Sequence, residues 1–282
     1  MKEAMYYERL NRGEVSCRLC PHYCKIAPGE VGKCRVRKNI DGKLYSLNYG
    51  KITSYGYDNI EKKPLFHFHP GKRIFSIGSF GCNLSCKFCQ NWQIAQDKPL
   101  SVEISDEDIL SLAKAKGSIG IAYTYNEPSI WFEYVLHLSK LNKEEGLNNV
   151  LVTNGFINPK PLEELLPYID AMNIDLKSIS DDFYMDICNG RVDPVLETIK
   201  RSARFTHVEV TTLLIEGRNT NLEEIESIAK TIASIDRDIP LHLSRYFPAY
   251  KMKEPETNID TVFLAKSIAD RYLDNVYVGN IF

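Results

Sequence analysis

The amino-acid sequence predicts an α/β fold, a partial TIM-like (β/α)6 barrel preceded by a small N-terminal module that contains four cysteines. From residue 73 onward, short apolar runs rich in Ile and Val alternate with amphipathic stretches, which is typical of βα units and a parallel sheet. The first 70 residues differ, because Cys and Gly concentrate early and short strand-like runs follow. We therefore expect residues 1–70 to form a four-cysteine metal module with short strands and residues 71–282 to form the barrel.

Seven apolar segments are the expected barrel strands, and they span residues 73–78, 119–125, 149–154, 171–177, 207–215, 240–246 and 275–279. Helices are expected in most of the gaps between them. Ser105 and Asp108 resemble a capping box, and apolar residues between positions 222 and 235 recur at helical spacing. The apolar face of residues 129–145 ends at Gly146, a natural C-cap. Six or seven such units predict a barrel, and a doubly wound sheet shares this pattern.

Composition excludes several classes of function. The chain has 282 residues and is 44% hydrophobic, which is enough to bury a full-sized core. Its 35 Lys and Arg residues nearly balance 37 Asp and Glu residues, so there is no basic field to indicate nucleic acid or an anionic membrane surface. The N-terminus lacks a secretory apolar core, and no apolar run reaches the roughly 18 residues of a spanning helix. We expect a cytoplasmic protein that makes no membrane contact.

The cysteines are clustered along the sequence. Four lie at positions 17, 20, 24 and 34, three at positions 82, 86 and 89, and Cys188 stands alone. In a reducing compartment such clustering indicates metal ligands rather than disulfides. An isolated cysteine is usually a small buried hydrophobe, so we assign Cys188 no role.

Cys82, Cys86 and Cys89 form a C-x3-C-x2-C pattern directly after the first expected barrel strand. Barrel enzymes place their chemistry at this end of the strands. A cubane iron-sulfur cluster is normally held by four thiolates, so three cysteines without a local fourth leave one iron open to a substrate or cofactor. The alternative is a structural zinc site that takes its fourth ligand from His67 or His69, although such sites usually present paired knuckles.

Cys17 and Cys20 have the spacing of a metal knuckle, and Cys24 and Cys34 complete a set of four thiolates. Four thiolates fill the coordination of either a tetrahedral zinc ion or a second cluster. The spacing matches neither of the ferredoxin patterns, so zinc and a second iron-sulfur cluster both remain open. We interpret His22 as a neighbour of this site rather than a ligand.

Polar residues follow the carboxyl ends of several expected strands. Because side chains two residues apart share a face of a strand, Asp175 and Lys177 are expected to face the barrel interior. The same reasoning places Glu209, Thr211, His242 and Ser244 inside. Charged groups in an interior need a partner or a ligand, so Asp175 and Lys177 form either a structural ion pair or part of a binding site.

The three-cysteine loop, with Phe88 before its last cysteine, is similar to the signature of the radical S-adenosylmethionine (SAM) superfamily. Residues 45–50, 60–65, 67–71 and 81–92 resemble the pyruvate formate-lyase activating enzyme-like branch and, within it, the group called AmmeMemoRadiSam. The similarity covers nearly the whole chain. Members of that group often continue into a short cysteine-bearing tail, whereas this sequence ends at Phe282.

The resemblance implies a radical SAM oxidoreductase. Its open iron would chelate the amino and carboxylate groups of SAM, and one electron from the reduced cluster would yield a 5′-deoxyadenosyl radical that abstracts hydrogen from an unidentified substrate. It further implies that SAM is bound by Glu127, Asn154, Asp175, Lys177 and His242. Glu127 would face the SAM ammonium, Lys177 its carboxylate, Asp175 its ribose or amino group, and His242 the ribose. Alternatively, Glu127 is an acid in the first turn of a helix and His242 a hydrogen-bonded core residue.

The same resemblance implies a reductant such as flavodoxin or ferredoxin, and a protein substrate or the associated Memo-like protein as partner. One version of this function is a glycyl radical enzyme activase. The other, which we favour, is modification of a small molecule, a protein or RNA alongside the two protein families that give AmmeMemoRadiSam its name. The N-terminal module, however, is unlike the ferredoxin-type inserts of many activases. A hypothesis of another class is a non-catalytic iron-sulfur or zinc scaffold, or an electron carrier.

Overall fold

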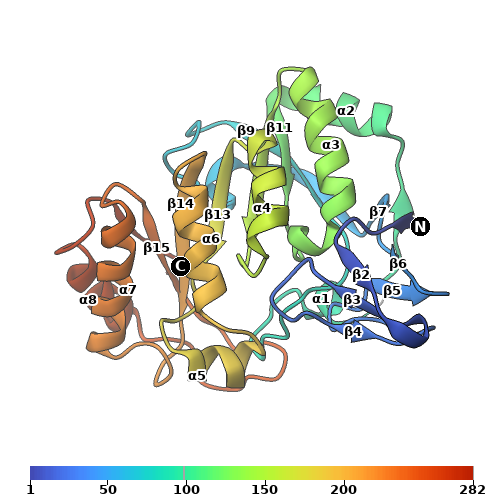
Figure 1. Cartoon of the computed structure of the whole chain (residues 1–282). Coiled ribbons are helices and arrows are strands. Elements are labelled where there is room, and N and C mark those ends of the chain that lie inside the picture. Colours follow the sequence, from blue (N-terminus) through green and yellow to red (C-terminus); the bar gives the residue numbers. More distant parts are fainter. Residues whose placement is uncertain (98, 282) are drawn as a thin grey trace.

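A sheet of eight strands forms the centre of the computed structural model, which describes residues 1–97 and 99–281 (Figure 1). Its strands lie in the order β16-β15-β14-β13-β12-β11-β9-β8. They span β8 (Ser54–Asn59), β9 (Arg73–Gly78), β11 (Ser118–Tyr123), β12 (Asn148–Thr153), β13 (Ala171–Asp175), β14 (His207–Leu214), β15 (Leu241–Arg245) and β16 (Val276–Gly279). Strands β9 and β11 to β16 are mutually parallel, and β8 pairs antiparallel with β9. Within the described residues β8 and β16 do not pair, so the sheet is a partial barrel.

Each of the seven predicted strands is present, and its ends lie within two residues of the prediction. The helices between them are α2 (Asp106–Lys114), α3 (Phe132–Glu144), α4 (Pro159–Leu165), α6 (Asp193–Ser202), α7 (Leu222–Ile235) and α8 (Ile259–Ala269). The chain therefore builds six β/α units and ends on a further strand, which confirms the predicted (β/α)6 fold. The predicted cap is also present, because Oγ of Ser105 accepts a hydrogen bond of 3.1 Å from the amide of Asp108.

Shorter helices lie in the N-terminal region and in the connections between the strands. They are α1 (Trp92–Ala95), α5 (Asp181–Phe183), the 3₁₀ segments η1 (Asn11–Gly13), η2 (Ile60–Lys62), η3 (Ala115–Gly117), η4 (Pro128–Trp131) and η5 (Leu166–Tyr168), and the π-helical η6 (Tyr184–Cys188). No helix among the described residues is both long and apolar enough to cross a membrane.

The N-terminal region contains small antiparallel sheets beside the barrel (Figure 1). One pairs β1 (Lys2–Glu3), β6 (Lys43–Ser46) and β5 (Arg37–Ile40), and another pairs β2 (Tyr7–Arg9), β3 (Val15–Cys17) and β4 (Lys25–Ile26). A third joins β7 (Lys51–Ile52) to β10 (Val102–Glu103). Strand β8 already belongs to the central sheet, so that sheet begins before the predicted boundary at residue 71.

A buried ion pair joins the N-terminal region to the barrel. Nη1 of Arg37 donates to Oε1 of Glu133 in α3 at 2.6 Å, and only 2% of each side chain is exposed. The second guanidinium nitrogen of Arg37 donates to the carbonyl of Ile130 at 3.1 Å. The amide of Met5 also donates to Oε1 of Glu133, at 3.0 Å. The two regions therefore share a desolvated interface.

The amino-terminal end of the barrel is held together by Glu209, near the start of β14. Its carboxylate accepts hydrogen bonds from the amides of Phe66 and His67 at 3.0 and 2.8 Å. It also meets Nε2 of His207 at 2.9 Å and Nε2 of His242 at 2.6 Å. Burial raises the pKa of Glu209, but these imidazoles and amides outweigh it and lower the pKa to about 2. These hydrogen bonds hold the segment that contains Phe66 and His67, before β9, against this end of the sheet.

Candidate functional site

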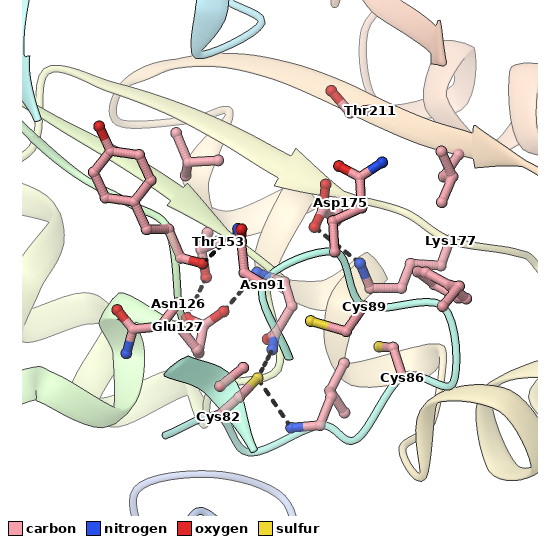
Figure 2. Close-up of a pocket in the computed structure, with 18 of the residues that line it drawn as sticks. Cys82, Cys86, Cys89, Asn91, Asn126, Glu127, Thr153, Asp175, Lys177 and Thr211 are labelled. Atoms are coloured by element: carbon pink, nitrogen blue, oxygen red, sulfur yellow. Dashed lines mark hydrogen bonds and ion pairs between the residues drawn. The ribbon is translucent and has the colours of Figure 1, made fainter. Parts of the chain in front are cut away.

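A cavity of about 280 Å³ opens at the carboxyl ends of the barrel strands, on the side where barrel enzymes carry their chemistry (Figure 2). The loop after β9 contributes Cys82, Cys86 and Cys89 to its wall, and the strand ends contribute Glu127, Thr153, Asn154, Asp175, Lys177, Thr211 and Ser244. Figure 2 shows the three sulfur atoms on one side of the cavity and the charged strand-end residues beside them. The fold thus brings together all but one of the residues predicted to bind the cluster or SAM.

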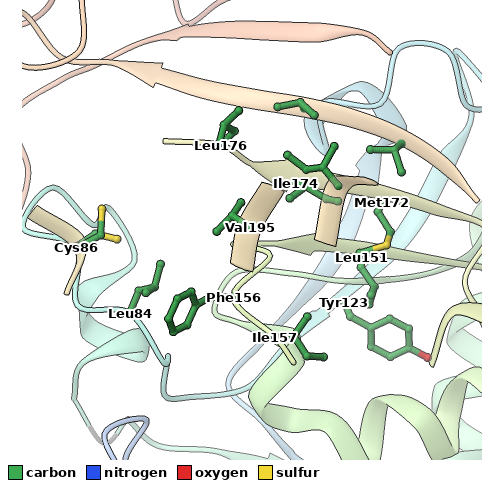
Figure 3. Close-up of a cluster of buried hydrophobic side chains, with 14 of the residues drawn as sticks. Leu84, Cys86, Tyr123, Leu151, Phe156, Ile157, Met172, Ile174, Leu176 and Val195 are labelled. Atoms are coloured by element: carbon green, nitrogen blue, oxygen red, sulfur yellow. The ribbon is translucent and has the colours of Figure 1, made fainter. Parts of the chain in front are cut away.

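The three-cysteine loop is anchored in the apolar core. Leu84 and Phe156 are each at most 2% exposed and lie in one apolar cluster with the side chains of β13 (Figure 3). The carbonyl of Cys188 accepts a hydrogen bond of 2.9 Å from the amide of Ser85. This packing gives the loop a defined conformation, so its sulfur atoms are held against the barrel mouth.

Two nitrogen donors reach the sulfur atom of Cys82, the first cysteine of this loop. The amide of Leu84 donates to Sγ of Cys82 at 3.4 Å, and Nδ2 of Asn154 reaches the same sulfur at 3.6 Å. Hydrogen bonds of this kind stabilise a thiolate, the form of cysteine that ligates metals.

The donor set fits a [4Fe-4S] cluster. Three thiols line a cavity with room for several atoms, and no fourth cysteine is among the residues that line it. Three thiolates leave one iron open. In the described part of the chain, no three Cys, His, Asp or Glu side chains converge as ligands of a single ion. The cysteine side chains of both sets must therefore change rotamer to bind metal.

Glu127 is a fixed, buried carboxylate in the cavity wall. Its oxygens accept hydrogen bonds from Oγ1 of Thr153 at 2.7 Å, the amide of Asn154 at 2.8 Å and the amide of Ser129 at 2.9 Å. Burial raises its pKa, and these donors oppose the rise. The hydrogen bond from the amide of Ser129 makes Glu127 the N-cap of η4. Glu127 is therefore both a helix-terminus residue and a residue of the cavity wall.

Asp175 and Lys177 also line the cavity and pair with each other. Nζ of Lys177 donates to Oδ2 of Asp175 at 2.9 Å, and 11% and 36% of the two side chains are exposed. Burial disfavours the charge of Lys177, but Asp175 and nearby thiols outweigh it and hold the lysine pKa well above its usual value. Leu176, between them, is fully buried on the opposite side, as the alternation predicts.

His242 lies outside this cavity. Its Nε2 meets Oε2 of Glu209 at 2.6 Å, and its ring packs edge-on against Phe66 with centroids 4.7 Å apart. Ser244, two residues further along β15, is the residue that reaches the cavity. We therefore do not include His242 in the proposed SAM site, and its surroundings agree with the alternative of a hydrogen-bonded core histidine.

His67 does not lie with the three-cysteine loop either. Its Nε2 meets the hydroxyl of Tyr277 at 2.6 Å, and neither His67 nor His69 lines the cavity. The alternative zinc site at this loop therefore lacks the fourth ligand that it required.

Two residues near the loop carry contacts that the sequence analysis missed. Cys188 is fully buried, as expected, and its carbonyl accepts the hydrogen bond from the amide of Ser85 in the loop. Asn83 accepts a hydrogen bond of 2.9 Å from Asn154 and donates one of 2.6 Å to the carbonyl of Phe156. The position of Asn83 directly after Cys82 was the only available signal, since its partners are distant in sequence.

The four N-terminal cysteines also meet in space. Cys17, Cys20, Cys24 and Cys34 line one small enclosed cavity together with Arg37. Cys17, Cys20 and Cys34 are at most 7% exposed. The structure thus gathers both predicted cysteine sets, each in its own cavity.

Comparison with known proteins agrees with this architecture. The model of the radical SAM superfamily matches residues 76–232. An uncharacterised protein of Methanocaldococcus jannaschii is 41% identical over the whole chain and 86% of its own length. A putative glycyl-radical enzyme activating enzyme of the same organism is 29% identical, covering 70% of this chain and 77% of the relative. The pyruvate formate-lyase-activating enzyme of Clostridium pasteurianum is 27% identical, and the match covers 56% of this chain and 69% of the relative.

Among solved structures, Streptococcus suis SuiB bound to S-adenosylmethionine aligns with a TM-score of 0.57 at 17% identity, covering 71% of this chain and 48% of that one. The fold and the site define a barrel protein with a cysteine-lined cavity at the carboxyl ends of its strands. The match of the superfamily model over more than half of the chain shows the family: the chain belongs to the radical SAM superfamily. Within it, the chain resembles the pyruvate formate-lyase activating enzyme-like branch. Its cofactors are accordingly a [4Fe-4S] cluster and SAM.

Proposed function

We propose that the chain binds a [4Fe-4S] cluster through Cys82, Cys86 and Cys89 and uses it to cleave SAM reductively. When bound and reduced, the cluster supplies the electron that converts SAM to methionine and a 5′-deoxyadenosyl radical, which takes a hydrogen atom from the substrate. The observation that carries the proposal is that three thiols and the charged strand-end residues line one cavity.

The residues of this cavity divide the binding of SAM between them. Lys177 suits the carboxylate of the methionine moiety because it is a cation held in position by Asp175. Asp175 retains free carboxylate surface for the ribose or amino group. Glu127, fixed by three donors, presents its charge to the ammonium group. Asn154 bridges the two parts of the site, since its backbone amide donates to Glu127 and its side-chain Nδ2 reaches the sulfur of Cys82.

We extend the proposal to the group within the superfamily, the reductant and the partner proteins. We place the chain in the AmmeMemoRadiSam group, with a reductant such as flavodoxin or ferredoxin and with a protein substrate or the Memo-like protein as partner. The relatives named as activating enzymes favour a second candidate, in which the hydrogen is taken from a glycine of a partner enzyme. We further propose that the four N-terminal cysteines bind metal and that residues 1–70 act as one module.

Anaerobic reconstitution tests the proposal. The protein is loaded with iron and sulfide, then incubated with SAM and dithionite, and 5′-deoxyadenosine is measured by chromatography. Release of 5′-deoxyadenosine supports radical SAM chemistry. A non-catalytic scaffold or an electron carrier would release none. Proteins that co-purify under anaerobic conditions are then added, and a glycyl radical signal in electron paramagnetic resonance identifies the activase.

A further inference from the structure

The four-cysteine cavity is suited to a small, anionic metal centre. Four thiols line this cavity, and those of Cys17, Cys20 and Cys34 are at most 7% exposed. Four cysteines gathered around one buried space have the composition of a zinc or iron-sulfur site.

A buried cation faces the same cavity. The guanidinium of Arg37 lines it, and the Arg37 side chain is only 2% exposed. Two of its nitrogens bind Glu133 and Ile130, but Nε has no hydrogen-bond partner among the described residues. Four thiolates around a divalent ion carry two net negative charges, and a neighbouring cation reduces the cost of burying them.

The size of the cavity favours one ion over a cluster. Its volume is about 10 Å³, against about 280 Å³ for the cavity at Cys82, Cys86 and Cys89. A space near 10 Å³ accommodates about one water-sized occupant. A cubane of four irons and four sulfides would require the module to open, whereas a tetrahedral zinc ion requires only that the thiols turn inward.

The module directly contacts the cluster loop. Nε2 of His22 lies 2.7 Å from the carbonyl oxygen of Asn83, between the first two cluster cysteines. Nζ of Lys33 donates to Nδ1 of His22 at 3.4 Å, which leaves the hydrogen on Nε2 for that carbonyl. Gly81 has φ of +85°, and a Cβ built there would lie 2.6 Å from the carbonyl oxygen of Cys34. The backbone of the cluster loop is thus seated on the four-cysteine module.

We propose that Cys17, Cys20, Cys24 and Cys34 hold one zinc ion, and that the zinc-bound module positions the cluster loop through His22 and the close approach at Gly81. This inference rests on the proposed function, because it assigns the module a role toward the [4Fe-4S] cluster. His22 and Gly81 act as positioning residues, since their contacts are with the loop backbone.

The test uses the full chain, reconstituted anaerobically, with metals counted by mass spectrometry. We expect about one zinc and about four irons per chain. The His22→Met variant retains all four cysteines, so it should keep its zinc while iron release to a chelator becomes about tenfold faster, as is usual when a residue supporting metal ligands is lost. His137→Met is the matched control, because His137 bonds to Asp106 and lines neither cysteine cavity. The spectrum of the reduced cluster, recorded with and without SAM, is a second measure of the cluster's surroundings and should change in His22→Met.

The outcomes separate the parts of the inference. About eight irons without zinc would show a second cluster and overturn the zinc site. One zinc together with unchanged iron release and unchanged spectra in His22→Met would overturn the positioning role. Cys20→Ser should lose zinc and release iron faster; if it does not fold, His22→Met and Gly81→Ala decide the question. A wild-type chain that binds zinc but never iron would instead contradict the proposed function, and the positioning role with it.

Discussion

Nζ of Lys177 lies 2.9 Å from Oδ2 of Asp175 in the wall of the proposed SAM cavity. The pair is neither fully buried nor free in solvent, because 11% of the lysine side chain and 36% of the aspartate side chain are exposed. It is therefore available to a ligand while each charge has a partner. Because the pair is partly exposed, a binding role and a structural role of Lys177 predict different effects of its removal on SAM affinity and on stability.

The Lys177→Met variant should bind SAM more weakly by about 1.5–3 kcal/mol, the value of a charge-assisted hydrogen bond. Its free energy of unfolding should fall by only about 1 kcal/mol, since Asp175 keeps contact with water. SAM titration and urea unfolding on the same protein measure both quantities. Lys87→Met is the control, because Lys87 forms an exposed pair with Asp186 at 2.7 Å in the cluster loop.

Unchanged SAM affinity in Lys177→Met would remove this residue from the site. A loss of stability of about 3–5 kcal/mol would instead identify a buried structural pair.

Replacing Cys82, Cys86 or Cys89 by Ala should abolish both the iron centre and the release of 5′-deoxyadenosine. A cubane held by two protein thiolates is poorly retained, because metal binding depends on the number of ligands. Iron analysis and chromatography of the products measure the two effects. Ser85→Ala alters the same loop without removing a sulfur, so it should keep both. Any cysteine variant with full cleavage activity would refute the cluster assignment.

Glu133→Leu should lower the free energy of unfolding by about 3–5 kcal/mol, because it leaves the buried guanidinium of Arg37 without its carboxylate. The double variant that adds Arg37→Met should recover much of this loss, since it removes the stranded charge. Lys114→Met breaks a comparable but exposed pair with Glu145 and should cost less than about 1 kcal/mol. Equal losses of unfolding free energy in Glu133→Leu and Lys114→Met would show that burial of the Arg37–Glu133 pair does not increase its contribution to stability.

Glu209 should make the stability of the barrel depend on acid pH. Its folded-state pKa of about 2 lies below its ordinary value of about 4.5, so the carboxylate stabilises the fold above the ordinary value. This contribution, on the order of 3 kcal/mol, should disappear as pH falls from about 4.5 to about 2. Urea unfolding of the wild type and of Glu209→Gln from pH 7 downward measures it. The two curves should converge toward pH 2, and a constant difference would contradict the assignment.

Local patterns in the sequence were sufficient for much of the fold. The strand ending at Asp175 was predicted because its apolar residues face one way and its polar residues the other, and period-two alternation is a property of any strand. The C-x3-C-x2-C loop was predicted for a similar reason, since its ligands lie within eight consecutive residues, Cys82 to Cys89. Short-range spacing of this kind does not depend on the rest of the fold.

Local sequence patterns were enough to predict the order of the β/α units, the two cysteine sets and the inward direction of Asp175 and Lys177. The tertiary structure decided how deep each inward residue lies, which is why Ser244 reaches the cavity while His242 bonds to Glu209 near the other end. It also decided that the four-cysteine module touches the cluster loop. The reason is physical: depth in a barrel and contact between distant segments depend on strand register and packing across many residues, and neither is encoded in local spacing.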